Sequence, residues 1–437
     1  MKDFQIFGYM QELVHAGLYV FYVGLFVWFI YKWQFFDVPG TSQQWFTFYF
    51  LLKVASGVLL TLIYTYYYTD QQKADIYRYF NDSRVISPLL FSNPSAWFSI
   101  MTGVGIENPS VFQYLVHTHY FSHPGHDIVT NNTFIIRVNV LLNYLSVSNI
   151  YINTLLINWI SFLSLTLLYK TLRPYFSSFE TLLQLPLFLL PSVVFWSSGL
   201  LKEALLFACI GPVLHPFVSQ EKIELKHWLS GVIAALLVLY IKLQVGAIML
   251  LGLLVLIAFK QKGISILVRV VAITMIVLGG LVLWGDRIAQ LLIGKRNEFA
   301  ELARLENAGS YLKITTYNPT LNNVIRLLPE AFQNSILRPY VWEGGKPFQL
   351  AFAAENTLFL LLLAGLLFFY KKPAGFRLQL CLFFLFIAVA NYMVIGITVP
   401  VLGAIVHYRV IAAPFLLLGV LLAVDLEKLR KALPTSS

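Results

Sequence analysis

The stretch that decides the fold is LPSVVFWSSGLLKE, residues 190–203, because the segments on both sides of it are apolar enough to cross a membrane. A proline, a tryptophan, two serines, a glycine and the adjacent pair Lys202–Glu203 stand where two spanning segments should meet. Charges at the edge of the hydrocarbon cost a few kcal/mol each, so they are rare and by default indicate a function. We therefore expect this corner to belong to a membrane-embedded site.

The composition of the chain indicates an integral membrane protein. Of 437 residues, 58% are hydrophobic and only 12% are charged, whereas soluble domains carry about 25% charged residues. The net charge of +10 does not indicate a nucleic-acid partner, because the basic residues flank apolar runs, as they do in membrane proteins. Cys209 and Cys381 lie inside apolar runs, so neither a disulfide nor a thiolate metal site is expected.

Apolar runs of about 17–25 residues predict roughly eleven spans, with a range of about 10 to 13. The predicted spans cover residues 11–32, 46–68, 150–169, 180–196, 200–218, 228–242, 244–260, 264–284, 356–370, 376–396 and 402–424. The segment 134–148 is apolar but short, so we interpret it as an interfacial or re-entrant helix, with a twelfth span as the alternative. The predicted fold is an all-α, polytopic membrane helix bundle that forms a single membrane domain over residues 1–437.

Basic residues gather in alternate short connections and predict the orientation of the chain. They are Lys170, Arg173, Lys222, Lys226, Lys260, Lys262, Lys371, Lys372, Arg377, Lys428, Arg430 and Lys431. The positive-inside rule places them in the cytoplasm, with the N-terminus outside and the C-terminus in the cytoplasm. Two long polar segments, 69–149 and 285–355, then become external loops, the first with interfacial helices. The corner at residues 190–203 falls on the same outer face.

The first long loop opens directly after a span with TDQQKADIYRYFND, residues 69–82, which contains Asp70 and Asp75. Acidic residues just past a span, under a long external loop, suit a catalytic base or a metal ligand. A solvated loop start, where acids are common, is the alternative.

Further along the same loop, HTHYFSHPGHD (residues 117–127) contains half of the eight histidines of the chain. The four histidines are His117, His119, His123 and His126. Imidazole and carboxylate are normal ligands of zinc and manganese, but this spacing matches no standard zinc motif. A bound divalent cation is one interpretation, and histidines near lipid headgroups, with no cofactor, are the other.

Three basic residues suit a phosphate ligand, and the neighbouring Glu203 can pair with Lys202 or with an arginine elsewhere. Arg137 carries a planar guanidinium that matches phosphate, although snorkelling to the membrane surface explains it equally well. Lys202 and Glu203 follow a Ser-Ser-Gly turn, where the N-terminus of a new helix would favour an anion. A helix cap with a local ion pair is the alternative for them. Lys242, in the short turn YIKLQVG, lies on the same predicted side.

The second long loop and the last span add a further candidate group. RPYVWEGGKPF, residues 338–348, contributes Arg338, Trp342 and Glu343, and Glu355 follows at the mouth of the next span. Such a mixture of basic, aromatic and acidic side chains suits a sugar, and a loop packed over the bundle is the alternative. GAIVHYRVIAAPF, residues 403–415, places His407 and Arg409 inside an apolar segment. A buried arginine needs a partner, such as Glu355 or Glu203, or a water-filled cavity.

Several of these segments resemble known membrane proteins of bacterial surface-polysaccharide synthesis. Asp70 and Asp75 resemble the first external loop of the GT-C superfamily of glycosyltransferases. PSVVFWSSGLLKE (191–203), RPYVWE (338–343) with AENTLFLLLL (354–363), and VPVLGAIVHYR (399–409) resemble elements of GT-C-like enzymes and Wzy-type oligosaccharide polymerases. The chain departs from that pattern in two ways: an additional span precedes the acids, and the acids do not form a strict D-x-D or E-x-D motif.

The resemblance implies transfer of a sugar from a polyprenyl-phosphate- or diphosphate-linked donor at the outer face of a bacterial inner membrane. Asp75 or Asp70 would be the base, and Lys202, Arg338 and Arg409 would hold phosphate or acceptor. The implied partners are the donor, a glycan or lipid-linked acceptor, and membrane lipid. A transporter or flippase of lipid-linked sugars and a non-catalytic subunit of an envelope complex are the alternatives.

Overall fold

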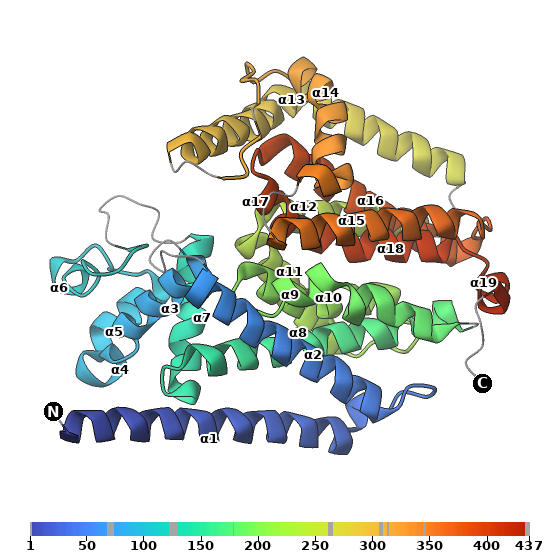
Figure 1. Ribbon diagram of the computed structural model, residues 1–437. Coiled ribbons are helices and arrows are strands. Elements are labelled where there is room, and N and C mark those ends of the chain that lie inside the picture. Colours follow the sequence, from blue (N-terminus) through green and yellow to red (C-terminus); the bar gives the residue numbers. More distant parts are fainter. Residues whose placement is uncertain are drawn as a thin grey trace. The chain divides into compact units, whose positions relative to one another are not determined.

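The computed structural model describes residues 2–67, 74–121, 130–177, 179–260, 265–305, 309–312, 314–343 and 347–432. These residues form helices joined by turns and short connections (Figure 1). Extended pairing in the described chain is limited to three isolated bridges, and no strand occurs in it. The protein is an all-α, polytopic helix bundle, as the sequence predicts.

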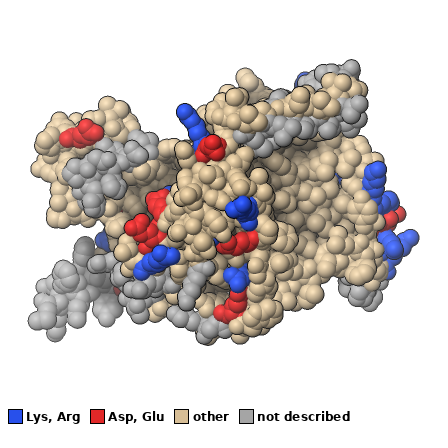
Figure 2. Space-filling view, turned by 90° about the horizontal axis from the view of Figure 1, so that it is seen from above, with Lys and Arg blue, Asp and Glu red and all other residues tan. Residues whose placement is uncertain are grey.

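Seven helices of the described chain are long and apolar enough to cross a membrane. They cover Met10–Lys32, Gln43–Tyr67, Ile150–Phe176, Leu243–Lys260, Pro347–Leu367, Gly375–Thr398 and Leu402–Leu422. Each overlaps one of the eleven predicted spans, and the spans predicted at 180–196, 200–218, 228–242 and 264–284 are not among these seven. On the face seen in Figure 2, uncharged side chains cover most of the surface, as expected for a chain that borders lipid.

Three predicted boundaries differ from the structure. The span predicted at 356–370 begins earlier, at Pro347, so Glu355 lies inside this helix and not at its mouth. The span predicted at 180–196 is interrupted, because Leu190 adopts an extended conformation between a π-helical turn and the helix that starts at Pro191. Pro186 and Pro191 each lack an N–H, so a single regular helix cannot pass through this segment. The span predicted at 264–284 is the first half of one helix, Ile266–Leu305, which continues into the segment predicted as a loop.

The chain divides into two compact units. The N-terminal unit comprises Met1–Lys170, Val194–Val213 and Ser230–Lys242, and the C-terminal unit comprises Thr171–Val193, Leu214–Leu229 and Leu243–Ser437. The first eleven helices are α1 (Lys2–Lys32), α2 (Gln43–Leu62), α3 (Asp75–Ile86), α4 (Leu89–Ser92), α5 (Pro94–Thr102), α6 (Pro109–Phe112), α7 (Asn131–Ser146), α8 (Ile150–Leu172), α9 (Pro191–Trp196), α10 (Lys202–Val218) and α11 (Leu225–Ile241). The remaining helices are α12 (Leu243–Lys260), α13 (Ile266–Leu305), α14 (Leu321–Phe332), α15 (Pro347–Leu367), α16 (Gly375–Thr398), α17 (Leu402–Tyr408), α18 (Ala412–Leu422) and α19 (Leu426–Ala432).

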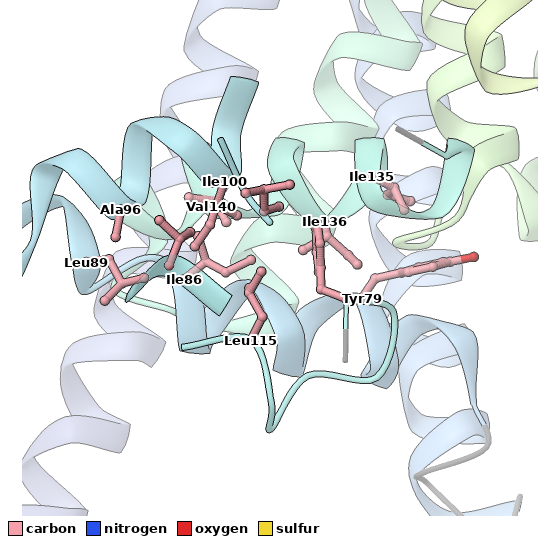
Figure 3. Close-up of a cluster of buried hydrophobic side chains, with 12 residues drawn as sticks. Tyr79, Ile86, Leu89, Ala96, Ile100, Leu115, Ile135, Ile136 and Val140 are labelled. Atoms are coloured by element: carbon pink, nitrogen blue, oxygen red, sulfur yellow. The ribbon is translucent and has the colours of Figure 1, made fainter. Parts of the chain in front are cut away.

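Helices α3 to α7 form a small helical subdomain of the N-terminal unit, which we call the headpiece (residues 74–121 and 130–146). Its core is a cluster of buried apolar side chains contributed by all five helices and the turns between them, including Ile86, Ile100 and Ile136 (Figure 3). Asp82 is buried beside this core, and its two carboxylate oxygens accept the backbone N–H groups of His119 at 2.7 Å and Tyr120 at 2.9 Å. The carboxylate therefore fixes the turn that follows α6.

Buried amides join the headpiece to the span α8. Asn143 of α7 donates to the hydroxyls of Ser83 at 3.0 Å and Ser87 at 2.9 Å. Asn153 of α8 donates to Asn143 Oδ1 at 2.7 Å and Asn139 Oδ1 at 3.1 Å. Because these amides are buried, each lost bond would leave a desolvated polar group. The network therefore holds the headpiece in one orientation on α8.

The C-terminal unit is organised around α16, which packs against α12, α14 and α18. Gly396 of α16 permits the close approach of α14, since a Cβ there would lie 2.2 Å from the carbonyl oxygen of Ala331. Arg296 of α13 is fully buried and donates to the carbonyl of Ile397 at 3.1 Å and to Glu330 at 2.7 Å. One guanidinium thus links α13, α14 and α16.

Candidate functional site

The corner at residues 190–203 is built around a buried lysine from α2. Lys53 is 3% exposed, and its ammonium donates to Ser197 Oγ at 2.8 Å, to the Ser197 carbonyl at 3.0 Å and to Ser198 Oγ at 3.3 Å. Three acceptors match the three N–H donors of an ammonium, which is the condition under which a buried charge is tolerated. The two serines therefore have a structural task within the N-terminal unit.

Gly57 explains why α2 can approach this turn so closely. A Cβ at Gly57 would lie 2.6 Å from the Ser198 carbonyl oxygen, 2.7 Å from Asn158 Nδ2 and 2.9 Å from Thr154 Cγ2. Asn158 of α8 in turn donates to the Lys53 carbonyl at 3.3 Å. These contacts hold the spans α2 and α8 against the Ser-Ser-Gly turn. They lie one helical turn after Lys53 along α2.

Helix α10 starts directly after this turn and carries two predicted site residues in its first turn. The Lys202 ammonium donates to Asn131 Oδ1 at 2.9 Å and lies 5.9 Å from the ring centre of Tyr79. Glu203 is 2% exposed and forms an ion pair with Lys242 at 3.3 Å. This contact brings Lys242 to the start of α10 and supplies a partner for Glu203.

Two tyrosines connect Lys202 to the predicted base Asp75. The rings of Tyr79 and Tyr120 stack with centres 5.4 Å apart. The Tyr120 hydroxyl donates to Asp75 Oδ1 at 3.2 Å, and the Tyr79 hydroxyl donates to Asn132 Oδ1 at 3.0 Å. Tyr79 lies at the edge of the headpiece core with its hydroxyl directed away from the apolar cluster (Figure 3). We call Asp75, Tyr79, Tyr120, Lys202 and Glu203 the N-terminal cluster.

Burial and nearby acids raise the pKa values of the two tyrosines in the N-terminal cluster. Burial raises the pKa of Tyr79 well above its usual value, and the charges of Asp75 and, to a smaller extent, Glu203 raise this pKa further. Burial and Asp75 likewise raise the pKa of Tyr120. Both hydroxyls therefore stay protonated at neutral pH and can serve as hydrogen-bond donors to an anionic group.

The guanidinium of Arg137 contacts groups inside the headpiece. It is buried in the headpiece, where its Nε donates to the Ile100 carbonyl at 2.9 Å and its guanidinium lies 5.8 Å from the ring centre of Phe121. Burial lowers the pKa of Arg137, while Tyr240 acts in the opposite direction. These contacts tie α7 to α5 and to the turn before residue 122.

The metal-ligand candidates are only partly described. Asp70, His123 and His126 lie outside the described residues. His117 is exposed, and the ring of His119 packs edge-on against Tyr120 with centres 4.7 Å apart. Within the described residues, no three histidine, cysteine or acidic side chains are arranged to hold a metal ion.

The remaining candidates gather in the C-terminal unit. Arg409 is buried and donates to the Arg338 carbonyl at 2.6 Å, and it interacts electrostatically with Glu355. Glu355 accepts the backbone N–H of Ser192 at 2.8 Å. Arg338 pairs with Glu343 at 3.0 Å. We call the set of Arg338, Trp342, Glu343, Glu355 and Arg409 the C-terminal cluster.

Trp342 is the most exposed member of the C-terminal cluster, at 82%. Its ring stacks on Tyr340 at 4.8 Å between centres, and the guanidinium of Arg338 lies 5.9 Å from the centre of the Tyr340 ring. The aromatic pair therefore offers one open flat face beside an ion pair. His407 makes a ring contact of 5.3 Å with Tyr408 and is partly buried.

Sequence reasoning missed Lys53, Tyr79 and Tyr120. A lone lysine in the middle of an apolar run was the available signal for Lys53, since such charges are rare in spans. The tyrosines carry no comparable signal, because the chain has 24 of them.

Comparison with known proteins found no match: no family model, no curated protein and no solved structure is similar to this chain.

Proposed function

We propose that this protein transfers a glycosyl group from a polyprenyl-phosphate- or diphosphate-linked donor at the outer face of a bacterial inner membrane. The transfer would serve the synthesis of a surface polysaccharide or glycoconjugate. The N-terminal cluster is the observation that carries the proposal. It combines an acid, two hydroxyl donors and a lysine at a helix N-terminus, and it adjoins spans in which a lipid-linked donor would lie.

The N-terminal cluster supplies the groups that such a transfer needs. Asp75 takes the proton of the acceptor hydroxyl, whose oxygen attacks the anomeric carbon while the bond from that carbon to the phosphate oxygen breaks. The electron pair of that bond leaves with the phosphate, where negative charge grows. Lys202 and the N-terminus of α10 are suited to this charge. The ion pair between Glu203 and Lys242 holds the first turn of α10 in place.

The C-terminal cluster is suited to a sugar. Aromatic faces such as that of Trp342 bind the apolar face of a pyranose, and the Arg338–Glu343 pair offers hydrogen-bond donors and acceptors for its hydroxyls. We assign to this cluster, taken by itself, the binding of a sugar unit of a glycan.

Purified full-length protein incubated with radiolabelled polyprenyl-linked sugar and a glycan acceptor tests the proposal. We expect Asp75→Asn to abolish labelled product without lowering expression or the melting temperature, because Asp75 accepts only one tyrosine hydroxyl at 3.2 Å in the described structure. Asp37→Asn is the matched control, since Asp37 is an exposed acid of the same unit that accepts from Gln43 at 2.8 Å. Unchanged product in both Asp75→Asn and Glu203→Gln would contradict the proposal.

Translocation of a lipid-linked sugar is the second candidate function. Interrupted helices are typical of transporters, and this chain has π-helical turns at Ile63–Tyr67, Leu185–Leu189 and Gln333–Leu337. Reconstituted vesicles separate the two functions. Labelled donor that changes leaflet without forming product identifies a flippase, and neither product nor translocation identifies a non-catalytic subunit.

A further inference from the structure

A groove lies beside α1 and α8 at the C-terminal end of α1 in the N-terminal unit. Its volume is about 560 Å³, and it is lined by Trp28, Phe29, Lys32, Trp33, Trp159 and Leu163. This volume falls within the range of roughly 300–1,000 Å³ that is common for small-molecule sites. The groove is far from the N-terminal cluster in sequence and shares no residue with it.

Ring stacking holds the walls of the groove in place. Trp159 of α8 stacks on Phe26 of α1 with ring centres 4.6 Å apart and planes inclined by 4°. The same indole contacts Phe29 at 6.4 Å and Phe36 at 5.9 Å between ring centres. Aromatic rings have few rotatable bonds and are held here on several sides, so the groove is largely preformed.

Basic residues lie at the same end of the unit. Lys32 is the last residue of α1, is exposed and lines the groove. Lys170 of α8 donates to the Phe35 carbonyl at 3.0 Å and lies 4.8 Å from the centre of the Phe35 ring. Tryptophan and lysine together at the end of a span are typical of the membrane interface, where indoles sit at headgroup level. Basic pockets between spans bind the headgroups of anionic lipids.

We propose that this groove binds an anionic phospholipid. One acyl chain lies along Trp28, Trp159 and Leu163, and the phosphate of the headgroup lies at Lys32. The occupant is a lipid because α1 is an apolar span, and most of its side chains are not covered by other parts of the protein. The groove beside it therefore opens towards the hydrocarbon. It is anionic because Lys32 is the charged side chain among the lining residues. This site is independent of the proposed glycosyl transfer.

Native mass spectrometry of the full chain after detergent delipidation tests the proposal, with phosphatidylglycerol and phosphatidylcholine of identical acyl chains as probes. We expect wild-type protein to retain phosphatidylglycerol preferentially. Lys32→Gln should weaken its retention about fivefold, because a lysine near an anionic headgroup contributes about 1 kcal/mol and 1.4 kcal/mol corresponds to a factor of ten. Leu163→Trp, which fills the groove, should remove binding of the lipid while leaving Lys32 in place.

Lys372→Gln is the matched control, because Lys372 is an exposed lysine of the C-terminal unit outside the groove. It should leave retention unchanged. Leu163→Phe serves as a smaller filler if Leu163→Trp melts early. Equal retention of the two lipids, an undiminished preference in Lys32→Gln, or an equal loss in Lys372→Gln would each overturn the proposal.

Discussion

Lys53 and Ser197 are joined by two hydrogen bonds inside the N-terminal unit, from the ammonium to the serine hydroxyl at 2.8 Å and to the serine carbonyl at 3.0 Å. Lys53 comes from the middle of the span α2, and Ser197 lies in the turn that precedes α10. One side chain thus couples a membrane span to the start of the helix that carries Lys202 and Glu203.

This relationship predicts an asymmetry between two substitutions. Ser197→Ala leaves a buried ammonium with one acceptor fewer, whereas Lys53→Met removes the charge together with its need for acceptors. Leaving a buried charge short of a partner is the more costly defect. We therefore expect Ser197→Ala to destabilise the protein by about 2–3 kcal/mol and Lys53→Met by less. Melting of the purified variants in the same detergent measures this order, and the reverse order would contradict it.

Gly57 predicts a second effect on stability. Gly57→Ala should lower the melting temperature, since the new methyl would lie within 3 Å of three atoms in the Ser198 turn and in α8. Overpacking of this kind costs about 1–3 kcal/mol. Gly24→Ala in α1 is the control, because a Cβ there has nothing within 4 Å. Equal melting of the two variants would show that α2 does not approach the turn so closely.

The Glu203–Lys242 pair predicts a strong coupling in a double-mutant cycle. Both side chains are largely withdrawn from solvent, with 3% and 13% exposed. Lys242→Met alone leaves the Glu203 carboxylate buried beside a methionine, which costs about 3–5 kcal/mol. Glu203→Gln in the same chain should recover much of that loss. Four melting curves provide the cycle, and purely additive losses would mean that the two groups do not interact.

Asp82 predicts a pH dependence of headpiece stability. Burial raises the pKa of Asp82 above its usual value, against the effect of the backbone N–H groups of His119 and Tyr120. A raised folded-state pKa means that the stabilising contribution is full below the unfolded pKa and is lost as pH rises through the folded pKa. The stability of wild type relative to Asp82→Asn should therefore fall as pH rises from about 4. Hydrogen exchange of α3 and α7 across this pH range measures the change.

Much of the bundle follows from composition alone, because spans are continuous apolar runs whose length is set by the bilayer. The prediction of 180–196 as one span was wrong because hydropathy counts apolar residues and ignores the N–H that Pro186 and Pro191 lack. The boundary predicted at 284 was also wrong. A long helix can leave the membrane without a break, and α13 continues to Leu305.

The N-terminal cluster was only partly predictable. Charged residues beside apolar runs are recognisable in a sequence, and this applies to Lys202, Glu203 and Asp75. All three lie in the N-terminal unit. Tyr79 and Tyr120 became recognisable only through packing, since a tyrosine in a headpiece core and a tyrosine on a surface look alike in sequence. Arg137 shows the opposite case: its position suited phosphate, but it donates to the Ile100 carbonyl within the headpiece.

The distance along the chain between Lys53 and Ser197 has a consequence for how the protein is made. The two residues are 144 positions apart, so at about 5–20 residues per second the ribosome needs on the order of 10 s to supply the acceptors of the lysine. During that interval α2 has left the ribosome with an ammonium that none of its final acceptors can reach. Cells should therefore insert α2 through a hydrated intermediate, and the span should settle in the bilayer only when the serine turn arrives.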